Sequence, residues 1–212
     1  MTTFPRRQYL SGVILVSINL VPLIGVIFLN WNIFSLLLLY WLENIVIGLY
    51  NILKIYKING FKNGTQTALF FTLHYGFFIF LHGIFIIMLF ASFLATSGAE
   101  VVSSPFLIKW SSSKEFVSSV GSVLVAFILL IFSHGLSCYI NFFKGNEYKK
   151  VSINRLFFRP YKRILLTDLA ILLGGTIIVF LRPSLWSLAL FVILKLFLDL
   201  FSHISEHSIQ DK

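Results

Sequence analysis

The chain has 212 residues, of which 58% are hydrophobic and 12% are charged. Soluble domains carry about 25% charged residues, so this composition argues against a water-soluble globular protein and against a disordered one. The 17 basic residues outnumber the 8 acidic ones, but they lie between apolar segments, which is typical of membrane topology. We therefore expect one membrane-embedded domain over residues 1–212 and no nucleic-acid partner.

Six apolar segments follow one another along the chain, each close to the roughly 20 residues that a helix needs to cross a bilayer. They predict an all-α, polytopic bundle of six transmembrane helices over residues 10–29, 33–53, 68–95, 116–143, 164–181 and 185–205. The short turns at 30–32 and 182–184 predict tight antiparallel hairpins. The first segment is longer than a signal-peptide core and has no small-residue cleavage site, so we expect an uncleaved first helix.

The basic residues are distributed unequally between the two sides of this predicted bundle. With the N-terminus inside, the inner side carries 13 of them: Arg6, Arg7, Lys54, Lys57, Lys62, Lys144, Lys149, Lys150, Arg155, Arg159, Lys162, Arg163 and Lys212. The outer side carries Lys109, Lys114 and Arg182. Because positive charge favours the cytoplasmic side, we expect a multi-pass protein of the cytoplasmic membrane with both termini in the cytoplasm.

The segment 144–163 combines seven of these basic residues with Phe157, Phe158 and Tyr161. Basic and aromatic side chains together favour contact with anionic lipid headgroups at the inner leaflet. A loop that only sets topology explains the same composition.

Ionisable residues inside the apolar segments are the candidates for function. Each costs about 2.5–3.5 kcal/mol to insert at the centre of a membrane helix and is by default a functional hypothesis. They are Glu43, His74, His82, His134, Asp168, Lys195, Asp199 and His203, with His207 at the boundary and Asn44 and Asn141 nearby.

The last helix suggests a metal site. Asp199, His203 and His207 recur every four residues and share one face of that helix, an order that suits a zinc or iron ion. His74, His82 and His134 on other helices can complete the ligand set. Glu43 is then a candidate general base for a metal-bound water, in hydrolytic or redox chemistry, and two facing histidines can alternatively bind haem.

Two other functions use the same residues. Glu43, Asp199 and the histidines can relay protons or a cation in a coupled transporter. In a non-catalytic structural subunit, the polar residues only join helices through hydrogen bonds, and Lys195 pairs with Asp199 along one helix.

Two short segments of the chain have similar sequences: residues 79–83 (Ile-Phe-Leu-His-Gly) and residues 131–135 (Ile-Phe-Ser-His-Gly). Inverted repeats are common in transporters, but five residues are too few to establish one here.

The order of several motifs resembles an uncharacterised prokaryotic membrane-protein family, domain of unknown function 6498. The motifs are Leu39–Gly48 with Asn51, His74–Gly76, His82–Phe85, Ser133–Ser137 with Asn141-Phe142, Pro160–Ile164, and Lys195, Asp199, His203 and Glu206-His207. They extend over nearly the whole chain. The resemblance implies a polytopic membrane protein and no assigned reaction.

Overall fold

The computed structural model describes residues 20–29, 31, 33–96, 113–181 and 185–208, and within them the side chains other than those of 33, 89–96, 113–120, 170–181 and 199–208. All regular structure in these residues is helical, as the composition predicts. The α-helices are α2 (Val21–Phe28), α3 (Ile33–Thr96), α4 (Ser113–Ser137), α5 (Ile153–Leu181) and α6 (Leu185–Ser208). A π-helical turn, η2 (Cys138–Lys144), extends α4, and a 3₁₀ turn, η3 (Glu147–Lys149), precedes α5.

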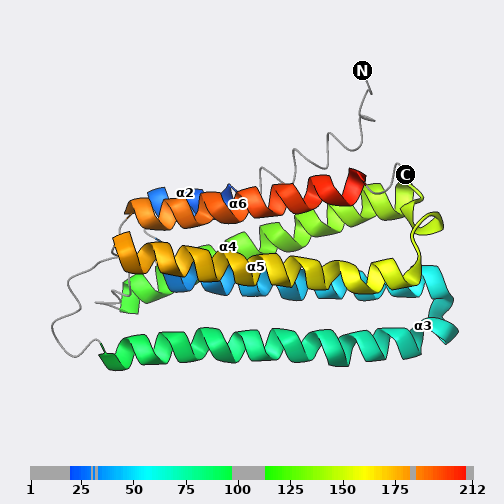
Figure 1. Cartoon of the computed structure of the whole chain (residues 1–212), viewed down its shortest axis with the longest axis horizontal. Coiled ribbons are helices and arrows are strands. Elements are labelled where there is room, and N and C mark those ends of the chain that lie inside the picture. The colour runs from blue at the N-terminus through cyan, green and yellow to red at the C-terminus, as the bar shows by residue number, and fades with distance from the viewer. Residues whose placement is uncertain (1–19, 30, 32, 97–112, 182–184, 209–212) are drawn as a thin grey trace, which may run out of the picture.

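Helix α3 is divided into two arms by Gly60. Gly60 has φ 71° and ψ 168°, a left-handed conformation that glycine adopts without the steric cost of a Cβ atom. The first arm (33–59) and the second arm (61–96) fold back on each other as an antiparallel pair (Figure 1). The second and third apolar segments of the sequence therefore lie side by side.

Two stretches that we expected to lie outside helices are helical. Residues 54–67 continue α3 on both sides of Gly60, and α5 begins at Ile153 rather than near residue 164. An apolar run marks only the part of a helix that is apolar, whereas Lys, Arg and Gln also favour the helical backbone. The turns predicted at 30–32 and 182–184 include residues outside the described part of the chain, as does much of the first predicted helix.

The helices run side by side along the longest axis of the molecule (Figure 1). Helix α5 packs against α6 and α3, α3 against α4, and α2 against α6. The bend of α3, the link from α4 to α5 and the end of α6 lie at one end of the bundle, and the start of α4 lies at the other (Figure 1).

The buried apolar side chains form two clusters, one toward each end of the bundle. One contains Trp31, Leu36 and Phe191, and the other contains Phe71, Phe142 and further buried side chains. On the first arm of α3, residues up to 42 belong to the first cluster, and residues from 50 onward belong to the second. Glu43 and Asn44 lie between the two apolar clusters.

Two helical stretches of the described chain are long and apolar enough to cross a membrane, Phe34–Met88 and Gly121–Lys144. The first includes both arms of α3, and a shorter apolar stretch covers Leu185–Leu198. Only 28% of the apolar window is buried in each long stretch. The length and the apolarity of these stretches are an indication of a membrane protein.

Candidate functional site

Glu43 is the centre of a buried group of charges. Its side chain is 7% exposed, and both of its oxygens accept hydrogen bonds from cations on other helices. Arg163 of α5 donates from Nη2 to Oε1 at 3.0 Å, and Lys195 of α6 donates from Nζ to Oε2 at 2.6 Å. One carboxylate therefore joins three helices.

A fourth helix contributes a histidine to the same carboxylate. His134 of α4 lies with Nε2 3.6 Å from Glu43 Oε1, and its side chain is 17% exposed. Glu43, His134, Arg163 and Lys195 are hereafter the Glu43 cluster. Because the members come from α3, α4, α5 and α6, a change in the charge of any one of them acts on the packing of four helices.

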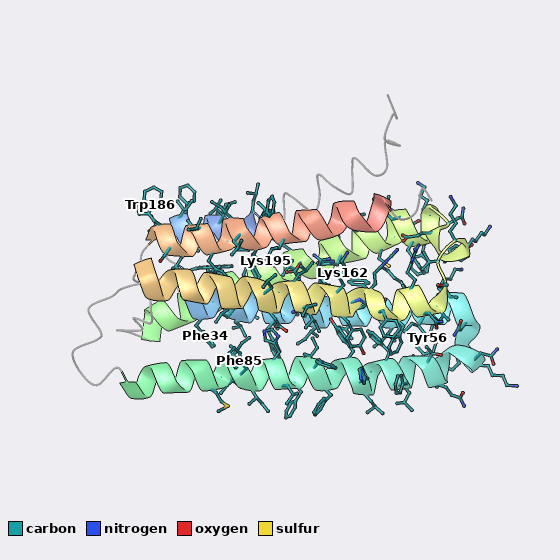
Figure 2. The ribbon with its side chains drawn as sticks, viewed as in Figure 1. Phe34, Tyr56, Phe85, Lys162, Trp186 and Lys195 are labelled. Atoms are coloured by element: carbon teal, nitrogen blue, oxygen red, sulfur yellow. The ribbon has the colours of Figure 1, made fainter. Side chains whose placement is uncertain are left out.

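Lys195 is the most deeply buried cation of the cluster. The residue is 2% exposed, and Nζ also lies 4.5 Å from the centre of the Tyr40 ring. In Figure 2 it lies near the middle of the length of α6, far from both ends of the bundle. Lys195 thus forms an ion pair with Glu43 on another helix. The ion pair with Asp199 on its own helix, which the sequence suggested, involves a side chain outside the described set.

The electrostatics of the cluster favour one role for Glu43 over another. A buried charge is costly unless it is paired and hydrogen-bonded, and Arg163 and Lys195 together stabilise the ionised carboxylate. A carboxylate held in this way is a poor general base, which is the role that we proposed from the sequence. It is also the carboxylate that faces His134, while Arg163 and Lys195 oppose a further positive charge there.

His82 and Asp168 form a second pair of a histidine and a carboxylate. His82 Nδ1 on the second arm of α3 lies 2.9 Å from Asp168 Oδ1 on α5. The His82 side chain is 8% exposed and the Asp168 side chain is 45% exposed. The pair is therefore open on its carboxylate side.

His74 has a different kind of partner. Its Nδ1 lies 2.7 Å from the hydroxyl oxygen of Tyr161 on α5, and its ring packs among the rings of Phe70, Phe78 and Tyr161. The side chain is on the outside of the described bundle, in an aromatic cluster.

The predicted metal ligands are thus only partly tested by this geometry. His74, His82 and His134 belong to three separate pairs, and the described residues contain no group of three or more His, Cys, Asp or Glu able to hold a metal ion. Asp199, His203 and His207 lie on α6 with side chains outside the described set. A site centred on α6 stays a prediction.

The two predicted asparagines, Asn44 and Asn141, have different surroundings. Asn44 is 2% exposed, and its amide nitrogen has no hydrogen-bond partner among the described residues. The amide nitrogen of Asn51, seven residues later in the same helix, is also buried and without a partner there. Buried donors without partners are expensive, and a water molecule commonly satisfies them. Asn141 lies in η2 and donates to Ser137 Oγ at 3.3 Å.

Arg163 is the member of the cluster that the sequence interpretation missed. We counted it as a basic residue of an inner loop, because it comes directly before an apolar segment. Helix α5 begins at Ile153, so Arg163 is already inside a helix and reaches Glu43. The helix-forming composition of 153–163 was the signal that could have identified it.

The comparison with family models identifies the family of the chain. The model of a family of unknown function (DUF6498) matches residues 1–212. The chain belongs to this family. No curated protein and no solved structure matches the chain. The description of the family assigns no function, so the residues themselves indicate what the protein does.

Proposed function

We propose that the protein is an integral membrane protein whose helices cross the cytoplasmic membrane six times, with both termini in the cytoplasm. The second arm of α3 supports this proposal, because its outer side carries large apolar side chains that are more than half exposed: Leu73, Phe77, Phe80, Ile87 and Met88. Large apolar side chains exposed together along one side of a helix are rare on a protein in water, and lipid is the solvent that suits them.

The basic end of the bundle supports the orientation. Lys57 lies 4.8 Å from the centre of the Tyr148 ring, Lys54 lies 5.4 Å from that of Phe142, and Arg159 pairs with Glu147 at 2.8 Å. These contacts join basic residues near the α3 bend and in α5 to the turns η2 and η3 at one end of the bundle. In the proposal, this end faces the cytoplasm and contacts anionic headgroups.

Cysteine accessibility tests the orientation. The single native cysteine is replaced with Cys138→Ala, and Ser104→Cys or Lys149→Cys is introduced in that background. An impermeant maleimide added to intact cells should label the first and not the second, and permeabilised cells should show both labelled. Labelling at 149 in intact cells would contradict the orientation.

We further propose that the protein translocates protons, with His134 as the central proton-binding group and Glu43 as its counter-ion. The observation that carries the proposal is the contact of His134 Nε2 with Glu43 Oε1, 3.6 Å apart, in a buried cluster drawn from four helices. Histidine changes charge near neutral pH, and chains of His and carboxylate residues inside membranes are typical of proton pathways.

The charges around His134 act on its protonation in opposite directions. Glu43 favours a proton on the imidazole, whereas Arg163 and Lys195 oppose a further positive charge. The buried amides of Asn44 and Asn51 can hold water beside this part of α3. In the proposal, a proton passes from water to Nε2 of His134 and leaves from the same atom to water on the other side.

Proton flux into liposomes tests this function. The purified protein is reconstituted with a trapped pH dye, and a potassium diffusion potential drives protons inward. The wild type should acidify the interior faster than empty liposomes, and Glu43→Gln should lower the initial rate by about tenfold or more, because the imidazolium loses its counter-ion. A wild-type rate equal to that of empty liposomes would overturn the proposal and leave the structural subunit as the better account.

A metal site on α6 is a second candidate, favoured by one observation. Helix α6 continues without a break to Ser208, so Asp199, His203 and His207 are spaced at one helical turn each. Zinc or iron that copurifies stoichiometrically and is lost in His203→Ala supports it, and a haem would give a visible Soret band. Protein without bound metal, and with a thermal stability that added zinc and iron leave unchanged, would exclude this candidate.

A further inference from the structure

The two short segments of similar sequence, 79–83 on the second arm of α3 and 131–135 on α4, dock on the first arm of α3 in the same way. Trp41 Nε1 donates a hydrogen bond to the carbonyl oxygen of Ile79 at 2.9 Å. The Tyr50 hydroxyl donates to the carbonyl oxygen of Ile131, also at 2.9 Å. In each segment the first residue accepts a bond from an aromatic side chain of the first arm.

The glycine at the end of each segment makes room for that aromatic side chain. A Cβ atom on Gly83 would lie 3.0 Å from Cζ2 of Trp41, and a Cβ atom on Gly135 would lie 2.5 Å from the Tyr50 hydroxyl oxygen. Both distances are shorter than ordinary contacts of a Cβ atom. Ile and Gly, four residues apart, thus form one docking surface on each helix.

The histidine precedes the glycine in both segments, and in both it faces a carboxylate. His82 Nδ1 lies 2.9 Å from Asp168 Oδ1, and His134 Nε2 lies 3.6 Å from Glu43 Oε1. Four features therefore recur together: the accepting carbonyl, the aromatic donor, the close glycine and the histidine beside a carboxylate. The two segments therefore share a local structure as well as a similar sequence of five residues.

We propose that His82 and Asp168 form a second proton-binding site of the same pathway, a proposal that rests on proton translocation through His134. With 2.9 Å between Nδ1 and Oδ1, one proton lies between the two atoms, because two acceptors at that distance would repel each other. The pair accepts a further proton on Nε2 of His82, which produces an imidazolium held by the carboxylate of Asp168.

The two sites differ in burial and in the charges that surround the histidine. The carboxylate side chain of Asp168 is 45% exposed, and that of Glu43 is 7% exposed. Among the described residues, the charged group facing His82 is Asp168, whereas His134 faces Glu43 with Arg163 and Lys195 beside it. Trp41 and Tyr50 are positioning residues that orient the two histidine-bearing segments.

The flux assay distinguishes this inference from the proposal on which it rests. His82→Gln and Asp168→Asn should each lower the initial proton flux by about tenfold or more, as expected when a group that accepts and releases protons is removed. The double variant should be no slower than either single variant, because both remove one site. Thr72→Val is the control: among the described residues, the Thr72 hydroxyl donates to the Ala68 carbonyl oxygen of its own helix, so this change should leave the flux unchanged.

The pH profile separates a proton-binding role from a structural one. Trp41→Phe removes the donor to Ile79 and should alter the pH dependence of the flux while the protein stays folded and monodisperse. If the wild type conducts protons and Glu43→Gln does not, but His82→Gln and Asp168→Asn conduct like the wild type, then this inference is wrong and the proposed function stands. If the wild type itself does not conduct, both fail.

Discussion

The Glu43 cluster and the His82–Asp168 pair each place an imidazole against a carboxylate, but they differ in what else contacts the carboxylate. Glu43 is buried and bonded to two cations from α5 and α6, whereas Asp168 is nearly half exposed and contacts His82. The first arrangement joins four helices, and the second joins one arm of α3 to α5.

One local motif has two roles in this molecule. A buried carboxylate needs several partners to offset the loss of water, so Glu43 is tied to packing as well as to charge. Asp168 has fewer protein partners than Glu43, so its pair with His82 contributes less to the packing of the helices. The same histidine-bearing motif is therefore part of a four-helix cluster in one place and of a simple pair in the other.

The largest expected effect is on stability at Glu43. Glu43→Gln leaves Arg163 and Lys195 without their shared carboxylate and should lower the free energy of unfolding in mixed micelles by about 3–5 kcal/mol. The control is Glu147→Gln, which breaks the more accessible pair with Arg159 and should cost about 1 kcal/mol or less. Equal losses in the two variants would show that burial of the Glu43 cluster contributes nothing.

Gly135→Ala should have the next largest effect. The added methyl group would lie 2.5 Å from the Tyr50 hydroxyl oxygen, and overpacking of this kind costs about 1–3 kcal/mol. Gly121→Ala on the same helix meets open space, so it should stabilise the protein by up to about 1 kcal/mol through helix propensity. Thermal unfolding of both variants checks the pair, and stabilisation by Gly135→Ala would contradict the docking of Tyr50.

Gly83→Ala should destabilise the protein less. Its added methyl group would lie 3.0 Å from Trp41, so a smaller shift of the ring relieves the contact, and the cost is about 1 kcal/mol. Gly76→Ala, seven residues earlier on the same arm and without neighbours within 4 Å, is the matched control. A lower melting temperature for Gly76→Ala than for Gly83→Ala would contradict the close contact with Trp41.

Asp168→Asn should have the smallest effect on stability. Because the Asp168 side chain is 45% exposed, the loss of its charge should change the free energy of unfolding by about 1 kcal/mol or less. Chemical denaturation in mixed micelles checks this value. A loss as large as that of Glu43→Gln would remove the contrast between the two sites.

The sequence predicted the all-helical fold because long apolar runs with few charges have one regular solution, the helix. It did not predict where the helices begin and end, because a helix can extend beyond its apolar run. Helix α3 continues past Lys54, and α5 begins at Ile153, before its apolar run. It identified Glu43, His82, His134, Asp168 and Lys195 as candidates by their presence in apolar segments.

Which of these residues meet could not be predicted, because the partner of each histidine lies on another helix and depends on packing. The similarity of residues 79–83 and 131–135 was visible in the sequence. Its structural meaning depends on the hydrogen bonds from Trp41 and Tyr50, which are distant in the chain. Arg163 was missed for the same reason: only the extended start of α5 brings it to Glu43.

A proton pathway through the Glu43 cluster is tested by the proton flux of Glu43→Gln and Glu147→Gln in reconstituted liposomes, at equal content of folded protein and matched orientation. Both changes remove one carboxylate from an ion pair with an arginine, but only Glu43 lies beside His134. We predict that Glu147→Gln keeps the wild-type flux and that Glu43→Gln loses about nine-tenths of it or more. Equal flux in the two variants would contradict a proton pathway through the Glu43 cluster.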